Sequence, residues 1–171
     1  MRTSIITTTN KTNGNKMKKN ILTILLLCAL CACSSSDDTK DTQQPVITEQ
    51  GVTADPIDCQ VYQRGQVIPF NYVFTDDTEL GAYNIEIHNN FDHHTHSTSA
   101  TECTIEAQKQ PVKPWVYNQD FAIPAGQQQY TARIDIPIPA DIDPGDYHFM
   151  VRLTDRAGWQ QLKAVAIKIT E

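Results

Sequence analysis

The chain has little positive charge beyond its first residues, and this shortage excludes one class of partner. Residues 1–32 hold five of the 14 Lys and Arg residues and no acidic residue. Residues 33–171 therefore hold nine basic and 20 acidic residues, a net charge of −11. A surface this acidic repels a phosphate backbone, so nucleic acid is excluded as a partner.

The sequence also lacks the short motifs of the commonest enzyme classes. It has no P-loop pattern, no glycine-rich dinucleotide fingerprint and no G-x-S-x-G motif around a serine. A three-histidine zinc site could activate water, but the sequence places no general base and no substrate pocket beside one. We therefore expect a protein that is not an enzyme.

No apolar run is long enough for a membrane span, which needs about 20 residues. The run Ile21–Leu30 follows the basic segment Met17–Asn20, as the core of a signal peptide does. It leads into Leu30-Cys31-Ala32-Cys33, which resembles the lipobox of bacterial lipoproteins. We expect residues 1–32 to be the signal peptide, with Met17 as the true start.

Cys33 is then the expected lipidation site, and residues 33–44 form a flexible polar tether. The run Ser34-Ser35-Ser36-Asp37-Asp38 resembles the surface-export signal of Bacteroidota lipoproteins. Acyl chains on Cys33 would anchor the protein stably to a membrane. The expected location is the outer membrane, either on its periplasmic side or exposed at the cell surface.

Helical periodicity is absent from residues 45–171, which instead alternate between polar and apolar residues in short segments bounded by turn residues. Seven to eight such strands predict an all-β domain with an immunoglobulin- or fibronectin-like sandwich, and a small barrel is the alternative. The predicted strands are Pro45–Thr48, Ile57–Gln63, Val67–Thr75, Ala82–Asn89, Glu102–Gln108, Gln129–Ile138, Tyr147–Thr154 and Leu162–Thr170.

Residue parity predicts which side chains face the core. Tyr83, Ile85 and Ile87 alternate with polar residues, and the apolar residues from Tyr147 to Leu153 alternate with His148, Met150 and Arg152. His88 and His148 should therefore point to the outer face. In an immunoglobulin-like sandwich these two strands are antiparallel neighbours, which places the end of one beside the start of the other.

Besides the lipidated Cys33, two cysteines follow the expected cleavage site, Cys59 and Cys103. Cys59 shares parity with Ile57 and Val61, and Cys103 with Ile105, so both are expected to face inward. An oxidising compartment favours a disulfide between them. The alternative is two buried thiols that do not meet.

All five histidines fall in two places, the stretch 88–96 and position 148. Neutral imidazole binds Zn(II) and Cu(II), so this density predicts a metal site. The expected ligands are His88, His94, His96 and His148, with His93 in reserve. Asp92 or Asp146 could add an oxygen or orient a ring.

Other interpretations of these residues stay open. The histidines could form a solvated loop or a hydrogen-bonded structural cluster. The segment Pro111–Ala125, with Trp115 and Phe121, could cover an edge of the sandwich or offer stacking faces to a glycan. The alternative function is accordingly a surface module that binds a protein or a glycan.

Acidic residues gather at the opposite end of the predicted strands. Asp76, Asp77 and Glu79 lie in one loop, and Asp155 begins the last turn. They could bind calcium through carboxylate oxygens, although such residues more often cap turns.

Three segments together resemble a family of Bacteroidota lipoprotein domains, domain of unknown function 4625. They are Asp77-x-x-Leu80, the block from Ile85 to His96, and the proline-rich segment Pro137-Ile138-Pro139-Ala140-Asp141-Ile142-x-Pro144-Gly145-x-Tyr147-His148. The resemblance covers most of residues 45–171, and the histidine-rich block is its most specific part. It implies an outer-membrane lipoprotein with an immunoglobulin-like fold, and it implies no activity.

Overall fold

The structure is a computed structural model that describes residues 40–96 and 103–171. Every regular element in this part of the chain is a β-strand. The eight strands are β1 (Val46–Thr48), β2 (Gln60–Gln63), β3 (Val67–Thr75), β4 (Leu80–Asn89), β5 (Tyr117–Ala122), β6 (Gln129–Pro137), β7 (Gly145–Asp155) and β8 (Gln160–Thr170).

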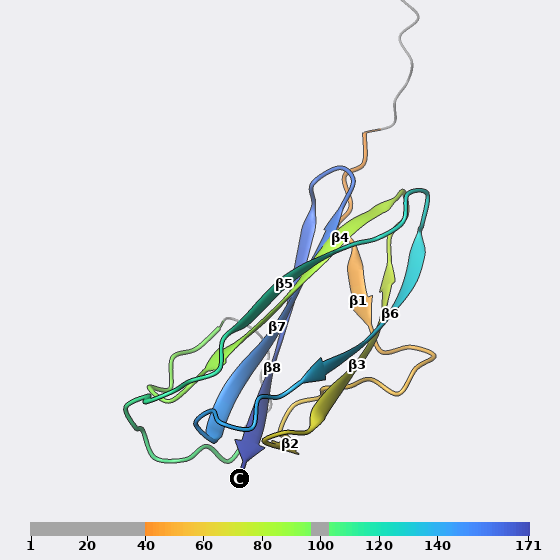
Figure 1. Ribbon diagram of the computed structural model, residues 1–171. Helices are drawn as coiled ribbons and strands as arrows, with labels where there is room; N and C mark the ends of the chain where they lie inside the picture. The colour runs from red at the N-terminus through yellow and green to blue at the C-terminus, as the bar shows by residue number, and fades with distance from the viewer. Residues whose placement is uncertain (1–39, 97–102) are drawn as a thin grey trace, which may run out of the picture. The chain divides into compact units, whose positions relative to one another are not determined.

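The strands form two sheets, as Figure 1 shows. The smaller sheet has the order β1-β3-β6 and the larger has the order β2-β8-β7-β4-β5. Pairing is antiparallel except between β2 and β8. This is the strand arrangement of an immunoglobulin-like sandwich, so the fold predicted from the sequence is confirmed.

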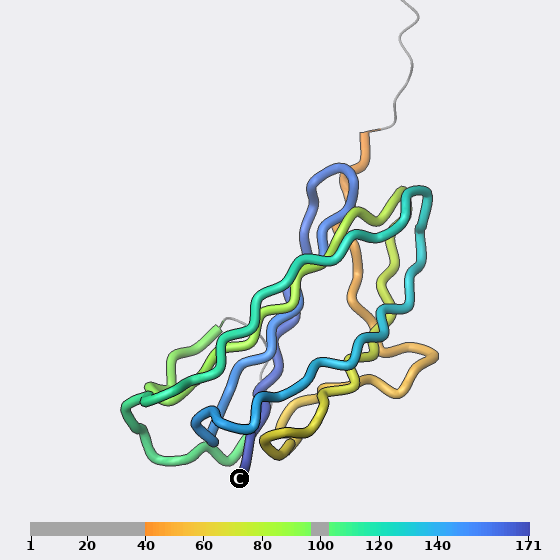
Figure 2. Tube along the Cα trace, viewed as in Figure 1, coloured from red at the N-terminus to blue at the C-terminus, as the bar shows by residue number. Residues whose placement is uncertain are grey.

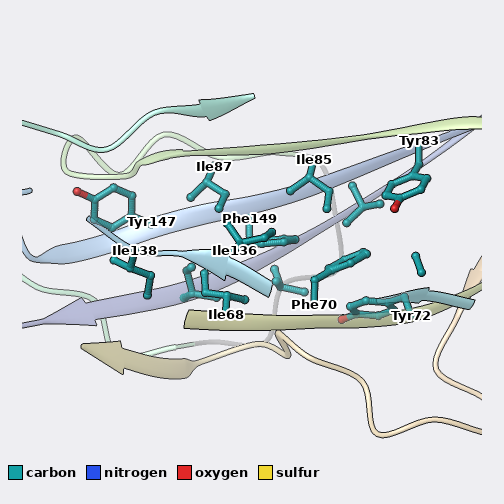
Figure 3. Close-up of a cluster of buried hydrophobic side chains, with 14 of the residues drawn as sticks. Ile68, Phe70, Tyr72, Tyr83, Ile85, Ile87, Ile136, Ile138, Tyr147 and Phe149 are labelled. Atoms are coloured by element: carbon teal, nitrogen blue, oxygen red, sulfur yellow. The ribbon is translucent and has the colours of Figure 1, made fainter. Parts of the chain in front are cut away.

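The core lies between the two sheets and includes the inward-facing residues that parity predicted for the segments at Tyr83 and Tyr147 (Figure 3). Tyr83, Ile85 and Ile87 are at most 3% exposed. Aromatic rings join the layers: the ring of Phe70 in β3 stacks on Phe149 in β7 with centroids 5.7 Å apart. Burial of such side chains is the main source of stability in a domain of this size.

The structure differs from the predicted strands in one segment: the strand expected at 102–108 is not seen in its described residues, and β5 is a strand that was not predicted. Residues 103–108 form no strand, whereas β5 pairs along the free edge of β4, where Figure 2 shows the two running side by side. β5 could not be recognised from its sequence, because Asn118, Gln119 and Asp120 are exposed in this edge strand and give it no apolar alternation. Phe121 stacks on Tyr83 at 4.9 Å, so its ring contributes to packing.

The parity expected for the segment of Cys59 is wrong. The strand begins only at Gln60, and Tyr62 is the residue that faces the core. Ile57 and Val61 are exposed, and so is Cys59, which has a positive φ of 65°. Ile105, whose parity Cys103 shares, is also exposed. Cys59 and Cys103 form a disulfide on the surface of the sandwich.

Residues Asp41–Glu171 form one compact unit. The predicted signal peptide over residues 1–32, the lipidation site Cys33 and residues 33–39 of the predicted tether lie outside the described residues. In the described part of the chain, no helix is long and apolar enough to cross a membrane.

Candidate metal centre

The site begins with a cross-strand pair. β4 and β7 are antiparallel neighbours, and His88 is directly opposite His148 in their register. Both residues alternate with core residues, Ile87 and Phe149, and therefore lie on the outer face of the sheet. The adjacency predicted from the sandwich topology is confirmed.

A tight turn after β4 returns the chain over this outer face. The backbone N–H of Asn90 donates to the carbonyl oxygen of Asp146 at 2.8 Å, and the N–H of His93 donates to the carbonyl of Asn90 at 3.3 Å. His93 has a positive φ of 61°, a conformation that histidine tolerates better than β-branched residues. The turn places His94 and His96 beside His88.

Three ring nitrogens converge at the centre. His88 Nε2 lies 3.2 Å from His94 Nε2 and 3.0 Å from His96 Nε2. The three ligand atoms all lie within 4.8 Å of one another. The three side chains are half-buried, since the loop covers the sheet while one side of the cluster stays open to solvent. This cluster could hold a metal ion.

Carboxylates contact the second ring nitrogen of two of these histidines. His94 Nδ1 lies 2.5 Å from Asp92 Oδ1, so the proton is on Nδ1 and the lone pair is on Nε2. Glu86 Oε1 lies 3.1 Å from His88 Nδ1, although the two atoms are not aligned as a hydrogen bond. Carboxylates commonly orient metal-binding histidines in this way.

The remaining histidines make contacts of a different kind. His148 packs its ring against all three, with centroids 4.5 Å from His96, 5.0 Å from His94 and 5.6 Å from His88. Its Nε2 lies 3.1 Å from the carbonyl oxygen of His94, to which it donates. His93 Nε2 donates to the carbonyl of Glu106 at 2.8 Å.

Burial keeps the two cross-strand histidines neutral. The pKa of His148 is lowered to about 4, mainly by desolvation; the hydrogen bond to the His94 carbonyl opposes this effect, and the neighbouring histidines add to it. Desolvation also lowers the pKa of His88, against the opposing charge of Glu86. Only neutral imidazole has a lone pair for a metal, so lowered pKa values suit ligation at neutral pH.

The segment after Cys103 supports the loop from its other side. The backbone N–H of Glu106 donates to Asp146 Oδ2 at 2.6 Å, and Lys168 Nζ lies 2.9 Å from Asp146 Oδ1. Asp146, which the sequence offered as an oxygen ligand, is therefore occupied by these contacts. A cavity of about 290 Å³ adjoins the cluster and is lined in part by His94, His96 and His148.

Sequence reasoning named Asp92 beside the site but overlooked Glu86. The signal was present, because Glu86 precedes His88 by two residues in a strand and so shares its face. The hydrogen bond from His148 to the backbone carbonyl of His94 could not be predicted from the sequence, because it depends on the path of the loop.

The fold and the cluster together define an immunoglobulin-like sandwich domain with three histidine nitrogens gathered on one outer face. The model of the family described as domain of unknown function DUF4625 matches residues 31–170. The chain belongs to this family. No curated protein matches it in sequence.

Proposed function

We propose that the protein is a non-catalytic, lipid-anchored metal-binding protein that holds one Zn(II) or Cu(II) ion through His88, His94 and His96. Its role is to capture or sense the metal, or to fix the histidine loop for a partner. The proposal rests on the three converging nitrogens, on their carboxylate contacts and on the lipobox-like sequence at Cys33.

The two short contacts of His88 Nε2 are the observation that carries the proposal. An imidazole nitrogen has either one proton or one lone pair, so His88 Nε2 can form only one well-aligned hydrogen bond. It nevertheless lies 3.2 and 3.0 Å from two other nitrogens. A tetrahedral ion with bonds of about 2.0–2.1 Å separates its nitrogen ligands by about 3.3 Å. One bound ion therefore accounts for both contacts.

The chemistry of the ligands favours Zn(II) or Cu(II). Neutral imidazole suits both ions, and their general affinity order places Cu(II) above Zn(II). Three nitrogens leave at least one coordination position for water or for a group from a partner. The adjoining cavity has room for such a ligand.

His148 acts in this proposal by positioning the loop. Its Nε2 donates to the carbonyl of His94, and this hydrogen bond holds the segment that carries two ligands against β7. The role differs from the direct ligation expected from the sequence, and mutation of His148 distinguishes the two.

The acidic residues of the site favour binding over catalysis. Asp92 and Glu86 both contact imidazole nitrogens, Nδ1 of His94 and Nδ1 of His88. Both carboxylates therefore lie beside Nδ1 atoms and not beside the Nε2 atoms that would hold the ion, so neither is placed as a general base for metal-bound water.

The proposed location is the outer membrane, with Cys33 acylated and the domain attached through the tether. Replacement of Cys33 by Ala should abolish palmitate labelling of the protein in its cells, and unchanged labelling would refute the lipid anchor. Protease treatment of intact cells then distinguishes surface exposure from a periplasmic location.

The metal site is tested by titrating the full chain, purified in detergent and stripped with EDTA, with Zn(II) and Cu(II) in a calorimeter. We expect one ion per chain with an affinity better than micromolar, and Cu(II) should displace Zn(II). His93→Ala is the matched control, because His93 lies in the same loop and donates to Glu106 instead.

Loss of binding in His88→Ala, with binding retained in His93→Ala, would support the site. Binding weaker than micromolar for both metals would overturn it. Retention on a glycan array that EDTA does not change would then favour the alternative of a glycan-binding module.

A further inference from the structure

Three acidic side chains meet at the end of the sandwich opposite the histidines. Asp41 precedes β1, Asp76 follows β3, and Asp155 is the last residue of β7. One carboxylate oxygen of each lies within 4.8 Å of the others. Leu80, which pairs with Asp155, and His88 are eight residue steps apart along β4, so about 26 Å of strand separates this acidic cluster from the histidines.

Two of these carboxylates each use one oxygen to hold a turn. Asp155 Oδ1 accepts hydrogen bonds from the backbone N–H groups of Gly158 at 2.6 Å and Trp159 at 2.8 Å. Asp76 Oδ1 accepts from Thr78 at 2.9 Å and Glu79 at 2.7 Å. Turn capping, the ordinary role of such residues, is complete with these four bonds.

The second oxygen of each carboxylate is buried and has no partner. Asp155 is only 4% exposed, and neither its Oδ2 nor that of Asp76 has a hydrogen-bond donor among the described residues. None of the ion pairs within residues 40–96 and 103–171 includes Asp41, Asp76 or Asp155. Buried charged oxygens are rarely left in this condition, because nothing offsets their lost hydration.

The third carboxylate belongs to the segment that leads into the domain. Asp41 Oδ1 accepts from the backbone N–H of Gln43 at 3.0 Å, and the Asp41 carbonyl accepts from Trp159 Nε1 at 3.1 Å. The Gln43 side chain donates to Asp77 Oδ2 at 2.9 Å. In Figure 1 this orange segment passes beside the turn between β7 and β8.

We propose that Asp41, Asp76 and Asp155 bind one Ca²⁺ ion, independently of the metal at the histidines. Hard oxygen ligands with three negative charges suit a divalent cation of this type. Ca²⁺–oxygen bonds of about 2.3–2.6 Å allow oxygens nearly 5 Å apart to share one ion. The ion fixes residues 41–45 to the β7–β8 turn and so makes the entry into the domain rigid.

The binding probe is Tb³⁺, a luminescent replacement for Ca²⁺, because Trp159 contacts Asp41 and can transfer its excitation. Titration of the full chain, purified in detergent, should give Trp-sensitised Tb³⁺ emission that Ca²⁺ reverses. Ca²⁺ should also raise the thermal unfolding midpoint, and Mg²⁺ at the same concentration should raise it less. His88→Ala should leave all of these results unchanged, which separates this site from the histidine centre.

Asp155→Asn and Asp76→Asn should each lower Ca²⁺ affinity at least tenfold, since each removes a charged oxygen but keeps the turn-capping oxygen. Both should also raise the unfolding midpoint measured in EDTA, because they relieve repulsion in the empty site. Asp77→Asn is the matched control and should change neither result. Asp41→Asn, which lies outside the core, tests the site if the buried variants do not fold.

The weakest Ca²⁺ sites of extracellular modules have dissociation constants of about 1 mM. If about 10 mM Ca²⁺ does not change the unfolding midpoint, the proposal is overturned. A shift that persists undiminished in both Asp41→Asn and Asp155→Asn would overturn it equally.

Discussion

His148 Nε2 donates a hydrogen bond to the backbone carbonyl oxygen of His94 at 3.1 Å. The bond joins a buried residue of β7 to the loop that carries two of the three proposed ligands. It therefore attaches the histidine loop to the sheet at the candidate metal centre. His148 thus differs from His88, His94 and His96, whose ring nitrogens converge as candidate ligands.

Replacement of a ligand should affect metal affinity more than replacement of the residue that positions it. We expect His88→Ala to lose at least about 100-fold in Zn(II) affinity and His148→Ala about 10-fold, a typical effect for residues that orient ligands. His148→Gln should restore much of the loss, because its amide can also donate to the His94 carbonyl. Equal, complete loss in His88→Ala and His148→Gln would identify His148 as a ligand.

The metal-free protein should lose stability as the pH falls below the ordinary range of histidine. The pKa of His148 is about 4 in the folded state, against 6.5 when exposed. Between these values the unfolded chain binds a proton that the folded chain does not, so folding weakens by up to about 3 kcal/mol as the pH falls from about 6.5 to 4. Urea unfolding in EDTA at several pH values measures this slope.

His148→Gln is the control for that experiment, since it removes the most strongly shifted histidine and should reduce the slope over the same interval, to which His88 also contributes. A slope identical to that of the unaltered chain would show that other groups cause the pH dependence.

Asp92 should increase metal affinity through the tautomer of His94. Its carboxylate holds the proton on Nδ1, and the same hydrogen bond lowers the pKa of Asp92. Asp92→Asn should therefore weaken Zn(II) binding by about 10-fold. Asp141→Asn is a suitable control, because Asp141 is also exposed with a lowered pKa but contacts Lys113. A loss of similar size in both variants would indicate a general effect of charge.

The disulfide should stabilise the domain and the histidine loop together. It joins Cys59 to Cys103 across 44 residues, a loop length that corresponds to about 4 kcal/mol in the chain-entropy model. Chemical unfolding of Cys59→Ser/Cys103→Ser should show a loss approaching this value. Zn(II) affinity should fall as well, because Cys103 lies just before Glu106, whose backbone N–H holds Asp146, and the Asp146 carbonyl anchors the turn after β4 through Asn90. Unchanged Zn(II) affinity would show that the disulfide does not support the histidine loop.

The sequence predicts those parts of the fold where apolar residues recur at every second position. β4 and β7 alternate between core and outer face, so their facing residues and the cross-strand pair of His88 and His148 could be anticipated. β5 could not, because an edge strand that exposes Asn118, Gln119 and Asp120 resembles a loop in composition. The parity of the segment at Cys59 failed because Tyr62 is the buried residue of β2, whereas Val61 in the same strand is exposed.

Neither candidate site could be completed from the sequence. Asp41 belongs to a polar stretch without any pattern, and only the folded structure brings it to Asp76 and Asp155. Glu86 could have been found by its parity with His88. The hydrogen bond of His148 depends on the turn at His93, whose backbone conformation no periodicity encodes.

The edge strand β5 bears on self-association. Its outer edge presents backbone groups to which another strand could add, the first step of edge-to-edge aggregation. On the face of the strand that points away from the core, Asn84 donates to both Asn118 and Asp120 at 2.8 Å. A second copy aligned antiparallel about Asp120 would set two carboxylates opposite each other, where like charges repel. The polar residues that make β5 hard to predict from the sequence thus also disfavour edge-to-edge pairing between copies of the protein at high local concentration.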